Sequence, residues 1–189
     1  ANKLNSILTD QELISMLLNP VESEKGFRLL ISQYKEQIYY VIRRIVLVHE
    51  DADDVFQNTM IKVFKNIKNF EFKSSLYTWV YKIATNESLT HLRIRKRLGN
   101  FDNNIPENIS DNLLTSDEYF EGDRLQLELQ KAVAALPEKQ KEVFNLKYYE
   151  EMKYGDMSKL LNTSEGALKA SYFHAVKKIE AFIKKSNII

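Results

Sequence analysis

The apolar residues between positions 27 and 45 recur at steps of three and four, and this stripe constrains the fold more than any other feature. It consists of Phe27, Leu30, Ile31, Tyr34, Ile38, Val41, Ile42 and Ile45. Residues at this spacing share one face of an α-helix, which predicts a long amphipathic helix from about Glu22 to Val48. Five Gly and three Pro in 189 residues leave little material for the turns of a β-rich fold. We therefore expect an all-α protein.

A strongly acidic segment divides the chain into two parts. Residues 101–123 contain seven Asp or Glu and no Lys or Arg. Residues 1–100 carry 15 Lys or Arg against 11 Asp or Glu, and residues 124–189 carry 12 against eight, so each part has a net charge of +4. Low hydrophobicity without a helical stripe predicts a linker. We expect two helical domains, 1–98 and 121–189, joined by a flexible acidic linker over 99–120.

Two further helices precede position 70. Thr9 and Glu12 form a capping box that opens a short helix through about Leu18. Another helix is expected from near Asp51 to about Lys68, with acidic residues in its first turn. Its predicted core face is Val55, Met60, Val63, Phe64 and Ile67. Gln57, Asn58 and Lys62 lie towards the other face, where they suit a protein partner, with plain solvent exposure as the alternative.

Residues 70–97 combine aromatic rings with a basic cluster. The rings are Phe70, Phe72, Tyr77, Trp79 and Tyr81, and the cluster is Arg93, Arg95, Lys96 and Arg97. Unpaired bases stack on aromatic faces with roughly 1–3 kcal/mol per base, and cations attract phosphates. This stretch therefore favours binding of a nucleic-acid strand whose bases have left the duplex.

The helix after position 75 has two distinct sides. Leu76, Trp79, Val80, Ile83, Thr90 and Ile94 share the side predicted to be buried, so Trp79 is interpreted as mainly structural. Lys82, Asn86 and Arg93 lie on the far side, with Leu89 among them. Long side chains with hydrogen-bond donors, together with an amide, suit contacts with bases and phosphates. The alternative is that this side of the helix only faces solvent.

The second part has the layout of a helix-turn-helix. Leu136, Pro137 and Glu138 begin a helix whose apolar side is Val143, Phe144, Leu146 and Tyr148. A short helix to about Leu161, a turn at Asn162 and Thr163, and a helix from Ser164 to about Lys185 follow, with Thr163 as the predicted N-cap. The last helix has a stripe predicted to be buried, at Leu168, Tyr172, Ala175, Ile179 and Phe182, and an outer side at Ala170, His174, Lys177, Lys178 and Ala181. This pattern favours major-groove binding, although helical hairpins on solvent are common.

Other features argue against an enzyme, a cofactor, a metal site or a small-molecule substrate. The chain has no Cys and no glycine-rich phosphate loop, and His49, His91 and His174 lack ligand spacing. It also has no run of 18 apolar residues and no signal peptide, so we expect a cytoplasmic protein.

Together these segments resemble the extracytoplasmic-function (ECF) sigma factors, the smallest group of bacterial RNA polymerase sigma subunits. DADDVFQNTMIKVFKNI (51–67) is similar to the helix that docks on the polymerase clamp, and FKSSLYTWVYKIATN (72–86) to the segment that opens and reads the minus-ten element. LPEKQKEVFNLKYYE (136–150) and TSEGALKASYFHAVKKI (163–179) resemble the domain that reads the minus-thirty-five element. The alternative is a helix-turn-helix regulator that binds duplex DNA without polymerase.

The resemblance implies partners and site residues. The partners are core RNA polymerase, through its clamp helices and flap, promoter DNA, and an anti-sigma factor. The implied minus-ten contacts, around a loop from Phe70 to Ser75 that captures a flipped base, are Phe70, Lys73, Ser74, Ser75, Tyr77, Lys82, Asn86, Leu89, Arg93 and Arg95. The implied minus-thirty-five contacts are Glu165, Ala167, Lys169, Ala170, Ser171, Phe173, His174, Lys177 and Lys178. The implied polymerase contacts are Asp53, Asp54, Gln57, Asn58, Ile61 and Lys62.

The last helix departs from the family. Relatives often carry Arg where this chain has Ser171, His174 and Val176. Fewer guanidinium groups mean fewer bidentate contacts with guanine, so we expect an upstream element that depends less on guanine, with the lysines attracting phosphates. Phe173 lies at the flank of the outer side; core packing is the favoured interpretation, and contact with a thymine methyl is the alternative.

Overall fold

The computed structural model describes residues 7–99 and 124–186, and every regular element in those ranges is a helix. The chain divides into two compact units, Ala1–Phe101 and Asp102–Ile189. The expected all-α class is confirmed. No helix in the described ranges combines the length and apolarity needed to cross a bilayer. Beyond Gly99, the predicted acidic linker lies outside the described residues.

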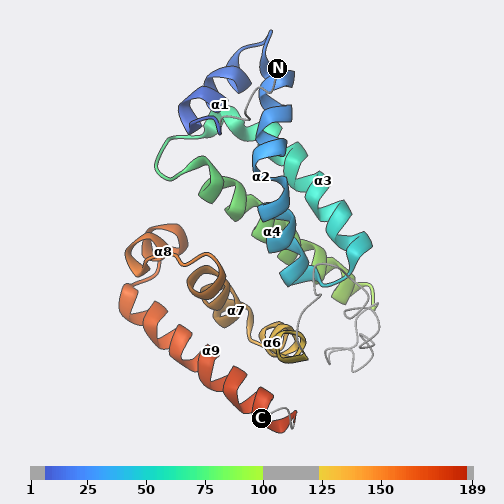
Figure 1. The fold of residues 1–189 in the computed structure, drawn as a ribbon, viewed down its shortest axis with the longest axis vertical. Coiled ribbons are helices and arrows are strands. Elements are labelled where there is room, and N and C mark those ends of the chain that lie inside the picture. The colour runs from blue at the N-terminus through green and yellow to red at the C-terminus, as the bar shows by residue number, and fades with distance from the viewer. Residues whose placement is uncertain (1–6, 100–123, 187–189) are drawn as a thin grey trace. The chain divides into compact units, whose positions relative to one another are not determined.

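In the first unit, a long central helix packs against three others (Figure 1). The unit contains α1 (Asp10–Leu18), α2 (Ser23–Val46), α3 (His49–Asn66), the short 3-10 helix η1 (Ile67–Asn69) and α4 (Leu76–Arg97). The stripe predicted for α2 faces the core, and the Thr9–Glu12 capping box is formed. α2 ends two residues earlier than expected, because Leu47 is left-handed (φ 62°) and the buried Arg43 donates to its carbonyl oxygen.

Helix α4 is turned from the predicted orientation. Its buried residues are Leu76, Val80, Tyr81, Ala84, Thr85 and Ser88. Thr90 and Ile94, both expected in the core, are exposed, Ile94 to 51%. The small side chains of Ala84 and Ser88 allow close packing, and the hydroxyls of Ser88 and Thr85 donate to the carbonyl oxygens of Ala84 and Tyr81. The helix therefore buries small and hydroxylated residues in place of Ile94.

The predicted core face of α3 is confirmed at four of its five positions. Val55, Met60, Val63 and Ile67 are buried. Phe64 was expected beside them but is 46% exposed, with its ring centroid 5.1 Å from that of Phe27 in an edge-to-face arrangement. It therefore covers the edge of the core and leaves much of its ring at the surface.

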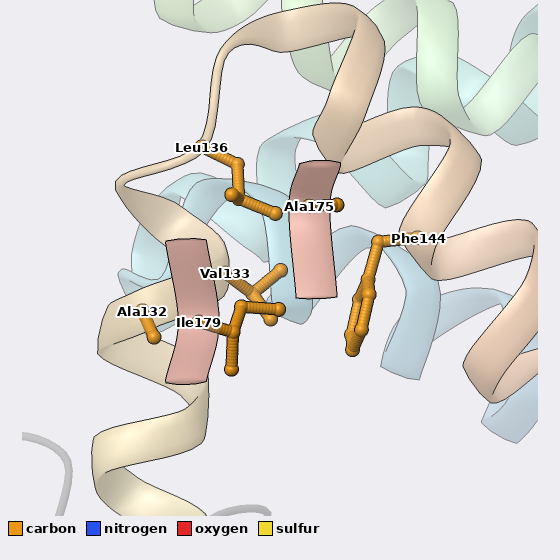
Figure 2. Close-up of a cluster of buried hydrophobic side chains, with 6 residues drawn as sticks. All are labelled: Ala132, Val133, Leu136, Phe144, Ala175 and Ile179. Carbon is orange, nitrogen blue, oxygen red and sulfur yellow. The ribbon is translucent and has the colours of Figure 1, made fainter. Parts of the chain in front are cut away.

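The second unit has its own hydrophobic core. Its helices are α6 (Arg124–Ala134), α7 (Glu138–Phe144), the π-helical turn η3 (Asn145–Tyr149), α8 (Tyr154–Leu161) and α9 (Glu165–Lys185). Side chains from α6, α7, α9 and the connection between α6 and α7 converge in one cluster (Figure 2), consisting of Ala132, Val133, Leu136, Phe144, Ala175 and Ile179. Leu168 is also buried, and Tyr172 and Phe182 are partly so, which confirms the stripe predicted for α9. Tyr148, expected on the apolar side of its helix, is half exposed.

The helix-turn-helix is formed by α8, a tight turn and α9. Asn162 ends α8 in the left-handed conformation (φ 49°). The N-cap of α9 is Ser164, whose Oγ accepts a hydrogen bond from the Ala167 N–H at 3.3 Å. The prediction of Thr163 as the cap was therefore wrong by one residue, because the left-handed turn at Asn162 delays the start of the helix.

Gly26 gives the first testable prediction. It lies in α2 where α1 approaches closely, and an added Cβ would lie 2.9 Å from Met16 Cβ and 3.1 Å from the Leu17 backbone N. Gly→Ala at an unhindered helix position stabilises by about 1 kcal/mol. We expect Gly26→Ala instead to lower the free energy of unfolding by about 1–3 kcal/mol through overpacking.

The matched control is Gly166→Ala in α9, where nothing lies within 4 Å of the added Cβ. Chemical denaturation of both variants measures the difference. Equal effects of the two substitutions would contradict the close approach of α1 and α2.

Candidate nucleic-acid interface

The loop between η1 and α4 is held at both ends. At its start, the Phe70 N–H donates to the Ile67 carbonyl oxygen at 3.0 Å. At its end, Ser75 caps α4, its Oγ accepting from the Thr78 N–H at 3.1 Å. Asp10 of α1 supplies a second acceptor, because its Oδ2 lies 2.8 Å from the Leu76 N. Loop residues 70–75 thus have a defined conformation.

Three aromatic rings form a cluster at this loop, which we call the aromatic loop cluster: Phe70, Phe72 and Trp79. The Phe70 ring lies 4.9 Å from that of Phe72 and 5.6 Å from that of Trp79, centroid to centroid. Phe70 is only 8% exposed, whereas Phe72 is 55% exposed. Phe70 was predicted to contact DNA. In this structure its ring is the buried part of the cluster, and the ring of Phe72 is the exposed part.

Phe72 also has an unusual backbone. Its φ of 54° lies in the left-handed region, which costs a non-glycine residue about 1–3 kcal/mol and occurs often at ligand sites. The sequence shows the aromatic residue, but neither the exposure nor this conformation follows from any local pattern. Phe72 was therefore counted among the rings of this stretch but missed among the individual contacts.

The polar stripe predicted for α4 is present. Lys82, Asn86 and Arg93 are exposed, and Leu89 among them is partly buried. Trp79 lies half-buried one turn before Lys82, so the stripe continues from the aromatic loop cluster along the helix. Rings followed by an amide and cations match what single-stranded nucleic acid requires.

Other predicted minus-ten residues have partners within the protein. Arg95 forms an ion pair with Asp51 of α3, and Asp51 Oδ1 also lies 3.3 Å from His91 Nε2. Lys73 pairs with Glu71 inside the loop, and this hydrogen bond lowers the pKa of the Glu71 carboxyl. The Tyr77 ring is partly buried, 5.6 Å from that of Tyr34. Ser74 and Ser75 are exposed.

The outer face of α3 also contains both exposed residues and residues that are paired within the protein. Asp54, Gln57, Asn58 and Ile61 are exposed. Asp53 accepts a hydrogen bond from the Tyr39 hydroxyl at 2.8 Å and lies 3.2 Å from His49 Nδ1. Lys62 pairs with Glu87 of α4. Asp53 and Lys62 therefore connect elements of the unit, and the other four residues form an open surface with Ile61 as its apolar member.

The outward side predicted for α9 is confirmed. Ala170, His174, Lys177, Lys178 and Ala181 are exposed, and so are Glu165, Ala167 and Lys169, whereas Ser171 is partly buried. The favoured interpretation of Phe173 as a core residue was wrong, since its side chain is 57% exposed. Phe173 precedes the buried Ala175 by two residues, about 200° around the helix, and therefore points away from the core. Lys177 Nζ lies 5.7 Å from its ring centroid.

Comparison with known proteins identifies the family. The sequence pattern of sigma-70 region 2 matches residues 30–98, and that of sigma-70 region 4 matches residues 126–179. The ECF RNA polymerase sigma-E factor of Haemophilus influenzae is 28% identical over 181 residues, which cover 92% of this chain and 94% of the relative. The chain belongs to the ECF group of the sigma-70 family. ECF sigma factor SigW of Bacillus subtilis is 26% identical to it over 155 residues, covering 77% of this sigma factor and 82% of SigW.

Solved structures agree on the fold of the sigma factor. Sigma factor RpoE of Bartonella quintana, crystallised with the anti-sigma factor NepR, superposes with a TM-score of 0.66 at 21% identity, covering 85% of this chain and 98% of that one. CnrH, solved with the cytosolic domain of CnrY, gives 0.65 at 17% identity, covering 93% and 97%. At these identities the likeness concerns the fold alone.

The aromatic loop cluster yields a stability prediction. Phe70→Ala removes a buried ring and should cost about 3–5 kcal/mol of unfolding free energy. Phe72→Gly removes a surface ring but relieves the left-handed backbone, so we expect a change within about 1 kcal/mol. Urea denaturation of both variants is the measurement. Equal losses would show that Phe72 belongs to the core and is not presented at the surface.

Proposed function

We propose that this sigma factor binds core RNA polymerase, directs it to specific promoters, and melts the minus-ten region with the aromatic loop cluster and the α4 stripe. The observation that supports this site best is the exposed, left-handed Phe72 beside Trp79, at the head of a stripe containing Lys82 and Asn86. The left-handed backbone costs about 1–3 kcal/mol, and the residue is still left 55% exposed. A ligand with flat, apolar faces accounts for it.

In the proposed melting step, stacking of a base on an aromatic ring competes with its stacking in the duplex. Extruding a base costs a few kcal/mol, and stacking on an aromatic ring returns roughly 1–3 kcal/mol per base. Phe72 and Trp79 would receive the extruded bases of the non-template strand, Asn86 would contact a base edge, and Lys82 and Arg93 would attract the phosphates. The step breaks no covalent bond, and we assign the chain no enzymatic reaction and no cofactor.

The polymerase contacts are assigned to the outer face of α3. Asp54, Gln57, Asn58 and Ile61 are all exposed along one side of α3, which joins an apolar side chain to polar ones, as is common in protein interfaces. We propose this face as the surface for the clamp helices, and the second unit as the partner of the flap. Because RNA polymerase works in the cytoplasm, we place the protein there.

For the upstream element, we propose that α9 lies in the major groove. His174 and Phe173 would face base edges, and Lys169, Lys177 and Lys178 the phosphates, on the basis of their exposure. Like RpoE of Bartonella quintana, which was solved with NepR, this protein is proposed to bind an anti-sigma factor. The alternative, a regulator acting without polymerase, is not favoured, because residues 30–98 match region 2 of the sigma-70 family.

The need for polymerase is directly testable. We expect a gel shift on promoter DNA, and run-off transcripts from genomic fragments, only when core enzyme is present, because the proposed function requires the complex with core enzyme. A specific shift of duplex DNA by the isolated protein, without transcripts when core enzyme is added, would instead support the regulator.

His174 tests the expected base preference. His174→Arg places a guanidinium fork on the exposed side of α9, where each bidentate pair with guanine is worth about 1–3 kcal/mol. Selection of promoters from random DNA by holoenzyme should show guanine enriched in the upstream element for this variant. His174→Lys adds charge without the fork and serves as control. An unchanged upstream preference in His174→Arg would refute the assignment of α9 to base contact.

A further inference from the structure

Asp10 connects the first helix to the far end of the proposed base-capture loop. Its Oδ2 accepts a hydrogen bond from the Leu76 N–H, 66 positions along the chain, at 2.8 Å. Leu76 is the first residue of α4 and directly follows the loop. On the other side of the loop, α1 packs against η1, which directly precedes it. One nine-residue helix therefore contacts both ends of the loop.

Helix α1 is itself fixed to α2. The Gln33 side chain forms two hydrogen bonds with the Leu8 backbone, accepting from its N–H at 3.2 Å and donating to its carbonyl oxygen at 3.1 Å. The Tyr34 hydroxyl donates to Asp10 Oδ1 at 3.4 Å. Burial, followed by the charge of Asp10, raises the pKa of the Tyr34 hydroxyl above its usual value. Both carboxylate oxygens of Asp10 are therefore engaged.

We propose that Asp10 is a positioning residue for promoter melting: its carboxylate fixes the start of α4, and with it the loop that presents Phe72 beside Trp79. The inference rests on the function proposed above. Trp79 lies three residues after Leu76, so a shift of the first turn of α4 also moves Trp79, one of the three rings of the aromatic loop cluster. A negative charge also favours the N-terminal end of a helix. The sequence pattern of region 2 begins at residue 30 and does not include Asp10.

Three variants test this in reconstituted holoenzyme. Asp10→Ala removes the acceptor, and Asp10→Asn keeps one oxygen in the same place for the Leu76 N–H. Ile14→Val trims a buried side chain of the same helix and leaves both hydrogen bonds intact. The measurements are the affinity for core enzyme, the affinity of holoenzyme for promoter DNA in the closed complex, in which the DNA is still paired, and the fraction of promoter melted. All are made well below the unfolding temperature.

We expect Asp10→Ala to lower the equilibrium constant for melting about tenfold, equivalent to about 1.4 kcal/mol, the size of one lost hydrogen bond. The affinity for core enzyme and the affinity of holoenzyme for promoter DNA in the closed complex should stay at the wild-type level. Asp10→Asn should recover most of the melting, and Ile14→Val should melt like the wild type.

Melting by Asp10→Ala at the wild-type level would overturn the inference while leaving the proposed function intact. An equal loss in Ile14→Val would also overturn it, because stability alone would then account for the effect. Failure of the wild-type holoenzyme to melt any promoter would instead refute the proposed function, and the positioning role with it.

Discussion

The packing of α4 against its neighbours determines what the first unit presents to a ligand. Ala84 and Ser88 lie in the middle of the buried face of α4, and residues this small let the backbones of packed helices approach closely. That approach fixes the rotation of the helix about its axis. Once it is set, Lys82, Asn86 and Arg93 point outward and Trp79 lies at the boundary beside Phe70. The proposed interface is thus a consequence of how small the buried residues are.

Local signals in the sequence predicted much of this fold. The α2 stripe and the Thr9 capping box depend on residues within a few turns of one another, and both are formed. The rotation of α4 depends on close contact with other helices, which hydrophobic periodicity does not reveal when the buried residues are Ala and Ser. Ile94 was therefore predicted to be buried and is exposed.

The candidate site was predictable to a similar extent. The exposed sides of α4 and α9 follow from helical spacing, and most of their residues lie where expected. Charge and residue type cannot tell a surface cation from one already paired across the fold. Arg95, bound to Asp51, and Lys62, bound to Glu87, are of this second kind. Loop conformation is the other limit, because the exposure of Phe72 accompanies a left-handed backbone that no local sequence pattern predicts. Phe173 was assigned to the core from its apolar character, against its angular position on α9.

The central claim is that Phe72 and Trp79 stabilise bases that have left the duplex. Permanganate footprinting of promoter thymines tests it most directly, with holoenzyme containing the wild type or Phe72→Gly, a substitution that spares the core. We expect reactive thymines upstream of the start site with the wild type, and strongly reduced reactivity with Phe72→Gly at equal promoter occupancy. Equal reactivity with both proteins, or unreactive thymines with the wild type on every template, would contradict it.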